Sequence, residues 1–457
     1  MRNISKEETS YFMLKKIITQ ALLAIILCTS VAKAQNGINL PYSQYGFGNS
    51  HTPYITPWSA AMGGVTATQS SNTFINPYNP ASYASVGMET FLFDMGLGLN
   101  TTWLRDPNAS LKDGDGTLAY ITGAFPVTKW WKMAIGLMPF SEVNYYSSQR
   151  SYSPLWDTMR TIYDGVGNVN KVFWGHGFRL SERLSLGANI NLLLGSSTRA
   201  VTYDFNNSDN VAFIDSRRQQ NSRITSVTLD LGATYRVPLG ENYNLMLGLT
   251  VNTPRTMNVK ENTMIYTFVT HRGTEFIRDT IFPAVGENSA YTSRYKLPST
   301  VTLGAAIQRN DLWQVAADLM YAPWRGAKYV ESNKAASTPS ILGNSIVIYD
   351  HNIRANLGWQ WLGDKNASHY IRRMGLSAGM HWEQGILRLK LNGQDNCINQ
   401  FGVGAGVMFP MRKGRSAVRL SVDWSTMGTA DILRCNTLLF GISMGSSDSW
   451  FVKRKYN

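Results

Sequence analysis

An alternation of apolar and polar residues across positions 222–237 constrains the fold of this chain more than any other feature. Residues that alternate with a period of two point to opposite faces of a β-strand. Here the positions from Val227 to Val237 form an apolar face, while the other face carries Asp230 and Arg236 among Gly, Ser and Thr. A soluble β-sandwich would turn that polar face to water, whereas a transmembrane barrel turns it to the lumen and gives the apolar face to lipid.

The same alternation recurs from residue 88 onward, in about fourteen segments of strand length. These segments cover residues 88–101, 115–125, 131–146, 169–180, 184–196, 222–237, 243–257, 298–309, 311–324, 350–363, 370–383, 398–410, 415–427 and 433–445. Short connections alternate with mostly long ones, as in bacterial outer-membrane barrels, whose short turns face the periplasm. The gap at residues 197–221 is expected as a loop, or as a hairpin that extends beyond the membrane. We therefore predict an all-β fold, a transmembrane antiparallel β-barrel of about fourteen strands.

Composition agrees with this fold. The chain has 39 Gly, 13 Trp, 22 Tyr and 18 Phe in 457 residues, and only 16% of its residues are charged, which suits a large β-barrel with aromatic girdles. After residue 35, no apolar run approaches the roughly 18–20 residues that a transmembrane helix needs. A net charge of +13 could indicate nucleic acid, but export would make outer-membrane lipid and other envelope components the expected partners.

The first 34 residues resemble a secretory signal peptide. Two lysines precede an apolar core at residues 17–27, and Ala32-Lys33-Ala34 has the small-x-small pattern of a cleavage site. Residues 1–12 precede a second Met and are interpreted as an over-long start. We predict export, cleavage before Gln35 and location in the bacterial outer membrane.

Once the signal peptide is removed, Cys397 and Cys435 are the remaining cysteines, in an oxidising compartment. A disulfide between them and two reduced thiols in separate loops are equally open alternatives.

Three further segments complete the predicted organisation. Residues 35–87 are rich in Pro, Asn, Ser and Tyr and do not have a strand pattern, which fits either a compact plug or a periplasmic tail. Residues 88–445 form the barrel. Residues 446–457 include the run Lys453-Arg454-Lys455 and are expected as a basic periplasmic tail.

Two short motifs before the first strand suggest a family. Ala61–Val65 (Ala-Met-Gly-Gly-Val) and Asn79–Ala81 (Asn-Pro-Ala) resemble the start of the FadL-like (FadL/TodX-type) outer-membrane β-barrels. Residues 171–187 also look like that family's strand-turn-strand pair, and both chain ends are similar to its Bacteroidetes-type members. The resemblance implies that residues 35–87 form a hatch inside the barrel lumen. The residues it assigns to the hatch are Met62, Gly63, Gly64, Asn76, Pro77, Asn79, Pro80 and Ala81.

The resemblance also implies a function. Family members mediate passive uptake of hydrophobic small molecules, such as long-chain fatty acids or aromatic compounds, through the hatch and a lateral opening. The alternative is a non-transporting barrel that acts as an accessory subunit of an envelope protein-secretion or assembly complex, because Bacteroidetes relatives include such proteins. A hydrophobic ligand and another envelope protein are therefore the two partners to consider.

No catalytic motif was found: the sequence lacks Cys-x-x-Cys, His-Glu-x-x-His and Gly-x-Ser-x-Gly. We therefore expect neither an enzyme nor a cofactor or metal site. Charged residues on the polar strand faces are the candidate ligand-binding groups, because an Arg fork suits a carboxylate headgroup. These candidates are Arg236, Arg354, Arg373, Arg419 and His381. The alternative is that such charges pair with one another or with the plug, since an unpaired buried charge is costly.

Overall fold

The computed structural model describes residues 39–449 with internal gaps. The gaps are residues 45–47, 51–55, 89, 155–156, 206–212, 273, 284–289, 311, 327, 332–346, 365–366, 392–393, 412–414 and 430. The predicted signal peptide and the basic run near the C-terminus lie outside the described residues.

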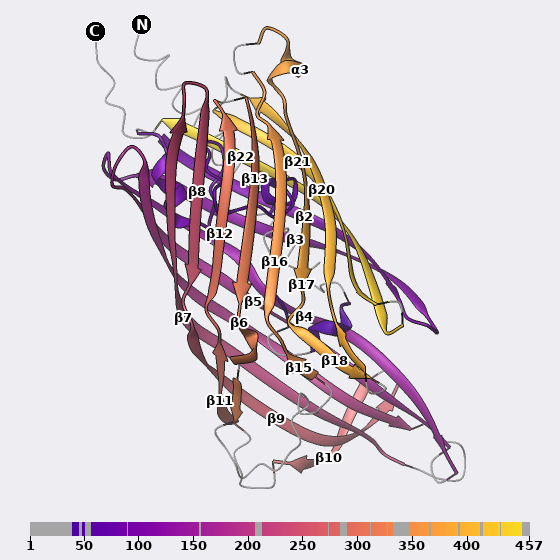
Figure 1. Ribbon diagram of the computed structural model, residues 1–457. Helices are drawn as coiled ribbons and strands as arrows, with labels where there is room; N and C mark the ends of the chain where they lie inside the picture. Colours follow the sequence, from indigo (N-terminus) through magenta and orange to yellow (C-terminus); the bar gives the residue numbers. More distant parts are fainter. Residues whose placement is uncertain are drawn as a thin grey trace, which may run out of the picture.

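Fourteen antiparallel strands close into a barrel, as predicted (Figure 1). They are β2 (Thr90–Arg105), β3 (Ser110–Pro126), β4 (Trp131–Ser153), β5 (Asp157–Arg179), β6 (Leu184–Phe205), β7 (Asp215–Leu239), β8 (Tyr243–Asn252), β12 (Thr300–Arg309), β13 (Trp313–Ala322), β16 (Asn352–Trp361), β17 (Gly375–Gln384), β20 (Gln400–Met411), β21 (Ser416–Thr429) and β22 (Leu433–Ser449). Each strand pairs with its neighbour in the chain order, and β22 pairs with β2 from Thr90↔Ser449 to Arg105↔Arg434. This last pairing leaves no free edge in the ring.

Apolar side chains point outward from this barrel. On β7, Val227 and Leu231 are 66% and 42% exposed, whereas their neighbours Thr228 and Asp230 are each 4% exposed. A continuous band of exposed apolar side chains is what a lipid-facing wall requires. The predicted assignment of the apolar face to lipid and the polar face to the lumen is therefore confirmed for this strand.

Helical segments are short. They are η1 (Pro41–Gln44), α2 (Pro57–Ala60), η3 (Pro80–Ser85), η4 (Trp324–Gly326) and α3 (Tyr370–Arg373). Within the described residues, none of the helices has the length and apolarity needed to span a membrane.

The strands β4 to β7 are longer than the sequence predicted. Residues 147–168 and 197–221 were expected as loops, but most of them continue the β4–β5 and β6–β7 ladders. Residues 258–297 likewise contain most of β9 (Arg255–His271), with β10 (Thr274–Phe282) and β11 (Ala290–Leu297). Outside lipid both strand faces can be polar, so the alternation disappears although the hydrogen-bond ladder continues. The alternative of a hairpin at residues 197–221 is therefore confirmed.

The two ends of the barrel differ. At the end where β2 begins, short turns connect the strands, such as residues 240–242 between β7 and β8. The extended strands and long connections lie at the other end (Figure 1). Because short turns face the periplasm in outer-membrane barrels, we assign the first end as periplasmic and the second as extracellular.

Prolines interrupt three neighbouring strands near the extracellular end. Pro254 separates β8 from β9, Pro298 separates β11 from β12, and Pro323 follows β13 before η4. Proline cannot donate a ladder hydrogen bond, which explains the breaks. Beyond them, β11 pairs with β9 and with β14 (Lys328–Glu331).

The chain before β2 runs through the barrel lumen from one end to the other. Near the extracellular end, the Tyr42 hydroxyl donates to the Leu433 carbonyl at the start of β22, 2.7 Å away, and β1 (Asn49–Ser50) pairs with β4. Near the periplasmic end, α2 and η3 pack inside the wall. We call the described residues of segment 39–87 the plug. Of the two alternatives for this segment, the structure therefore contains the plug rather than the tail.

The disulfide between Cys397 and Cys435 is not formed, and both cysteines are free. Cys397 ends β19 (Gln394–Cys397) in a small separate sheet with β15 (Val347–Tyr349) and β18 (Leu387–Leu391), where its thiol donates to the Gly385 carbonyl. Cys435 is buried in the wall strand β22 against Tyr42 and Leu104. The structure thus has two free thiols in different environments, and both lie in strands rather than in the loops that this alternative expected.

The lipid-facing assignment predicts how a charge is tolerated. Leu357 in the middle of β16 and Leu239 at the periplasmic end of β7 are both 45% exposed. We expect Leu357→Arg to lower the free energy of unfolding by about 2–4 kcal/mol and Leu239→Arg by about 0–1 kcal/mol, because the cost of a charge depends on its depth in the bilayer. Denaturant unfolding in lipid vesicles measures both values. Equal costs would contradict the assignment.

Candidate functional site

Polar side chains of the wall hold the plug. The carboxylate oxygen Oδ2 of Asp318 on β13 accepts hydrogen bonds from the backbone N–H groups of Thr66 and Ala67, at 2.6 and 2.9 Å. Asp94 on β2 accepts one from the N–H of Ile75 at 3.2 Å. An irregular segment has backbone groups without strand or helix partners, and these carboxylates satisfy some of them inside the lumen.

Amide and cationic side chains of the wall satisfy plug carbonyls. Asn356 on β16 donates to the Gly64 carbonyl at 2.8 Å, and Asn189 on β6 donates to the Pro77 carbonyl at 2.9 Å. Arg179 on β5 donates to the Ala84 carbonyl at 2.6 Å. The plug is thus bound by hydrogen bonds from strands around the barrel, which favours one fixed position.

The plug is also organised internally by two asparagines. Asn76 donates to the carbonyls of Thr66 and Gln69, at 2.7 and 2.9 Å, and Asn79 donates to the Ala67 carbonyl. The Asn79 side chain also accepts from the N–H of Ala81 at 3.1 Å and so caps η3, whose first residue is a proline. These bonds give the Asn-Pro-Ala motif its structural role.

Glycines on the inner wall let the plug backbone touch the strands. A Cβ atom at Gly404 would lie 2.0 Å from the Ala60 carbonyl oxygen, and one at Gly187 would lie 2.3 Å from the Pro80 carbonyl carbon. The same holds for Gly379, where a Cβ would lie 2.3 Å from the Gly63 nitrogen. Further wall glycines with plug backbone within 2.5 Å of such a Cβ are Gly248, Gly358 and Gly445. We call these six residues the glycine belt; they leave no room for a side chain between wall and plug.

The residues that the resemblance assigned to a hatch all lie in the plug. Met62, Asn76, Asn79 and Ala81 are each at most 2% exposed. Gly63 and Gly64 have φ angles of +62° and +83°, in the left-handed region that glycine adopts without strain. Pro77 and Pro80 flank the turn that Asn79 caps.

Three of the five candidate ligand-binding residues already have partners in the lumen. Arg354 forms an ion pair with Glu383, with Nε and Oε2 2.9 Å apart. Arg419 is buried, donates to the hydroxyl of Thr73 in the plug and lies over the Phe74 ring. His381 is buried, with Nδ1 3.7 Å from the Asp423 carboxylate. The expectation that lumenal charges pair with one another or with the plug is thus confirmed for Arg354 and Arg419.

The two other candidates do not lie in the enclosed lumen. Arg236 is exposed near the periplasmic end of β7, which ends at Leu239. Arg373 lies in α3, in the connection between β16 and β17, with its guanidinium over the Tyr370 ring. The sequence prediction that Arg373 is lumenal was wrong because the strand begins at Gly375, after this short helix.

A buried charge cluster that the sequence analysis missed lies on the inner face of β5, β7 and β9. Nζ of Lys171 and Nη2 of Arg255 lie 3.8 and 4.0 Å from the Asp230 carboxylate, which also accepts from Asn191 at 2.7 Å. Two cations thus face one carboxylate, and Nε of Arg255 is buried without a hydrogen-bond partner. The alternation Val169, Lys171, Phe173 was the available signal for Lys171; nothing local marked Arg255.

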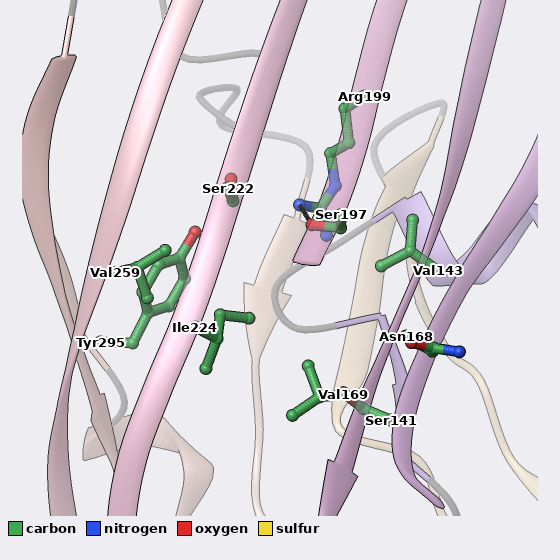
Figure 2. Close-up of a pocket in the computed structure, with 10 residues that line it drawn as sticks. All are labelled: Ser141, Val143, Asn168, Val169, Ser197, Arg199, Ser222, Ile224, Val259 and Tyr295. Atoms are coloured by element: carbon green, nitrogen blue, oxygen red, sulfur yellow. Dashed lines mark hydrogen bonds between the residues drawn. The ribbon is translucent and has the colours of Figure 1, made fainter. Parts of the chain in front are cut away.

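An apolar cluster lies next to these charges, toward the extracellular end. Val169, Leu193 and Ile224 from adjacent strands pack with Val259 and Tyr295. Figure 2 shows a cavity here, with Arg199 and Ser222 at one end and Val169 at the other. Its volume is about 10 Å³, which is room for about one water molecule.

A second cavity lies between α2 and the wall, lined by Trp58, Phe74 and Arg419 among others, with a volume of about 20 Å³. At the extracellular end, Tyr42 of η1 packs against Leu387, Ile398 and Leu104. The plug therefore contributes to packed clusters near both ends of the lumen.

Comparisons with known proteins bear on this arrangement. The model of the BamG family matches residues 13–457. No curated protein matches the chain.

Several solved structures share the fold. The chain is similar to a Pseudomonas aeruginosa FadL homologue, with 12% identity, a TM-score of 0.54 and coverage of 91% of this chain and 100% of that one. The Ralstonia pickettii toluene transporter TbuX has 13% identity and a TM-score of 0.53, with coverage of 86% of this chain and 97% of that one. The Pseudomonas putida toluene transporter TodX has 17% identity and a TM-score of 0.52, with coverage of 88% of this chain and 98% of that one. These neighbours are described as transporters or as a FadL homologue, and at these identities they establish the barrel fold alone.

The glycine belt predicts that one methyl group loosens the plug. We expect Gly404→Ala to destabilise the protein by about 1–3 kcal/mol, the usual cost of overpacking, and to make the plug accessible to protease. Limited proteolysis of the folded barrel measures this accessibility. Gly123→Ala is the control, because a Cβ there would lie 3.4 Å from the Phe91 ring, an ordinary contact. Equal plug protection in the two variants would contradict a tightly seated plug.

Proposed function

Because the chain belongs to the BamG family, whose model matches residues 13–457, and its barrel is filled by its own N-terminal segment, we propose that it is an outer-membrane accessory subunit of an envelope protein-secretion or assembly complex. In this role the barrel is a rigid membrane scaffold. Its ends and outer wall, rather than its lumen, supply the surfaces that bind partners.

The observation that carries this proposal is the seating of the plug. A gate that opens in each transport cycle must break its contacts with the wall repeatedly, at a cost that grows with the number of buried hydrogen bonds. Here Asp318, Asn356 and Asn189 bind the plug backbone from separate strands. The glycine belt adds direct backbone contact, and the two cavities beside the plug and beyond it have volumes of about 10 and 20 Å³. These features suit a permanent core better than a moving hatch.

Gentle detergent purification from the native outer membrane tests the proposal. We expect the protein to retain another envelope protein at near-stoichiometric level, and the isolated barrel to show no conductance in a planar bilayer. Mass spectrometry of the proteins and lipids in the same sample identifies what is retained. A barrel without any protein companion that carries a stoichiometric apolar molecule would refute the accessory role.

A second candidate function, uptake of a hydrophobic molecule, is favoured by the cluster of Lys171, Arg255 and Asp230. Two cations against one carboxylate leave an excess positive charge in a buried site, and a buried charge favours a counter-ion. The apolar cluster around Ile224 lies beside it, so the wall presents a cationic group next to an apolar surface. That combination matches an amphiphile with a carboxylate head. Pro254 and Pro298 interrupt the wall next to Arg255, where such a molecule could enter from the side.

This second candidate predicts a specific response to charge changes. We expect the double variant Lys171→Ala/Arg255→Ala to bind a long-chain fatty acid at least about tenfold more weakly, because a charge-assisted hydrogen bond contributes about 1.5–3 kcal/mol. Asp230→Asn should strengthen binding, since it removes the competing carboxylate. Equilibrium binding of the radiolabelled fatty acid to the purified barrel measures both effects.

Two controls sharpen this test. Arg354→Ala should leave the affinity unchanged, because Arg354 is already paired with Glu383. An uncharged alkane of the same length should respond to none of the charge variants. If wild-type protein binds neither probe, uptake of such molecules is refuted as the function.

A further inference from the structure

Charged residues are arranged differently at the two ends of the barrel. At the extracellular end, some of the cations form ion pairs: Arg160 with Asp204 and Arg217 with Glu275, each with a closest distance of 2.7 Å. Asp350 is buried there between Arg325 and Arg388. Burial alone would raise the pKa of Asp350. The N–H of His351 and the two guanidinium groups instead hold this pKa below its ordinary value.

At the periplasmic end, cations outnumber carboxylates. The cations at the described turns and strand ends are Lys129, Arg179, Arg183, Arg236, Arg309, Arg372, Arg373 and Arg415, and the carboxylates are Glu182, Glu241, Asp364 and Asp448. Among the described residues, no carboxylate lies within ion-pair distance of Arg183, Arg236 or Arg372, which are all exposed. The periplasmic end therefore presents an unneutralised positive field.

An apolar residue projects from this basic surface. Ile371 in α3 is 80% exposed, and its neighbour Tyr370 is 44% exposed. Figure 1 shows α3 at the tip of the connection between β16 and β17, beyond the ends of the neighbouring strands. A large apolar side chain held in water in this way is typical of a binding anchor.

The tip is held in place by contacts within the loop and with β20. The Tyr370 hydroxyl donates to the Pro410 carbonyl at the end of β20, 3.2 Å away, and the Arg373 guanidinium lies 5.3 Å from the Tyr370 ring centre. The N–H of Asp364 donates to the Arg372 carbonyl at 2.9 Å, which closes the loop. A pre-ordered anchor loses little conformational entropy on binding, which favours recognition.

We propose that this periplasmic surface docks the acidic face of a soluble periplasmic protein domain. Ile371 enters an apolar pocket of that domain, while Arg183, Arg236 and Arg372 face its carboxylates. The proposal rests on the accessory role above and names the surface and the chemistry of its partner. The positive field gives fast, salt-dependent association, and the apolar anchor gives the complex its lifetime.

A protein fits this surface better than lipid does. Lipid headgroups surround the barrel laterally, where the exposed side chains of the strands meet the membrane. The α3 tip instead continues beyond the ends of the strands, away from the lipid-facing wall (Figure 1). An apolar side chain that extends into the periplasm can be covered only by something that lies below the membrane.

The test is site-specific photo-cross-linking in intact cells of the native host. A photoreactive amino acid replaces Ile371 in one variant and Leu303, a residue on the lipid-facing side that is 57% exposed, in the other. We expect position 371 to cross-link to a single protein, one that has a net negative periplasmic domain. Position 303 should cross-link to no protein. The triple charge reversal Arg183→Glu/Arg236→Glu/Arg372→Glu should reduce this adduct at least tenfold.

A matched reversal at the extracellular end is the control. Arg105→Glu/Arg150→Glu/Arg278→Glu changes the net charge by the same amount on exposed residues and should leave the adduct unchanged. A lipid adduct at position 371, no adduct, or an adduct insensitive to the periplasmic reversal would overturn the docking site. If the triple periplasmic variant still retains a stoichiometric partner on purification, the accessory role stands and this surface is wrong. If the wild-type protein retains no partner, the accessory role itself fails.

Discussion

The need to pair every backbone polar group within lipid governs this structure. Hydrocarbon offers no hydrogen-bond partner, so the wall must be a closed ladder, and the pairing of β22 with β2 completes it. Closure fixes the alternation of side chains: apolar residues such as Leu357 point to lipid, and the polar half of every strand points inward. A lumen lined with Asp, Asn and Arg must then contain something that satisfies those groups. In this protein, that is the plug.

The plug and the wall supply hydrogen-bond partners to each other. An irregular chain inside a barrel has unpaired N–H and C=O groups, and the wall has side chains without backbone partners. Asp318 and Asn356 on adjacent strands satisfy neighbouring plug residues, one by accepting and the other by donating. The glycine belt then brings the two backbones into contact, since a side chain at Gly404 would hold them apart. The hydrogen bonds of the buried polar groups and the close packing of the backbones therefore depend on the same interface. A change in the plug or in the wall alters both the hydrogen bonds and the packing.

The sequence predicted the barrel because each transmembrane strand carries its own period-two pattern. The residues that the resemblance assigned to a hatch lie in the plug, and their burial follows from contacts with the wall. Prediction from the sequence failed where the determining contact is not local. The extracellular parts of β4 to β7 are strands by pairing, not by pattern, and Arg373 falls in a four-residue helix that the alternation did not show. Lys171 and Arg255 are 84 positions apart and meet at Asp230 only because β5, β6, β7 and β8 pair in this order and Arg255 follows closely after β8. Alternation determines which face a residue occupies, but not which residues on that face meet.

A filled lumen changes where function is to be sought. In an open channel the informative residues line the pore, whereas here most inward charges, such as Arg419 and Arg354, are already engaged with the plug or the wall. The remaining charges lie elsewhere: one excess cation where Lys171 and Arg255 share Asp230, and the exposed cations of the periplasmic end, of which Arg372 lies in α3. The first is small, buried and suited to a single amphiphile. The second is broad and exposed and includes an apolar tip, which is the arrangement expected of a protein interface. Ion pairs such as Arg160 with Asp204 are found at the extracellular end, whereas the exposed periplasmic cations Arg183, Arg236 and Arg372 have none among the described residues, which is explained by a partner that supplies carboxylates.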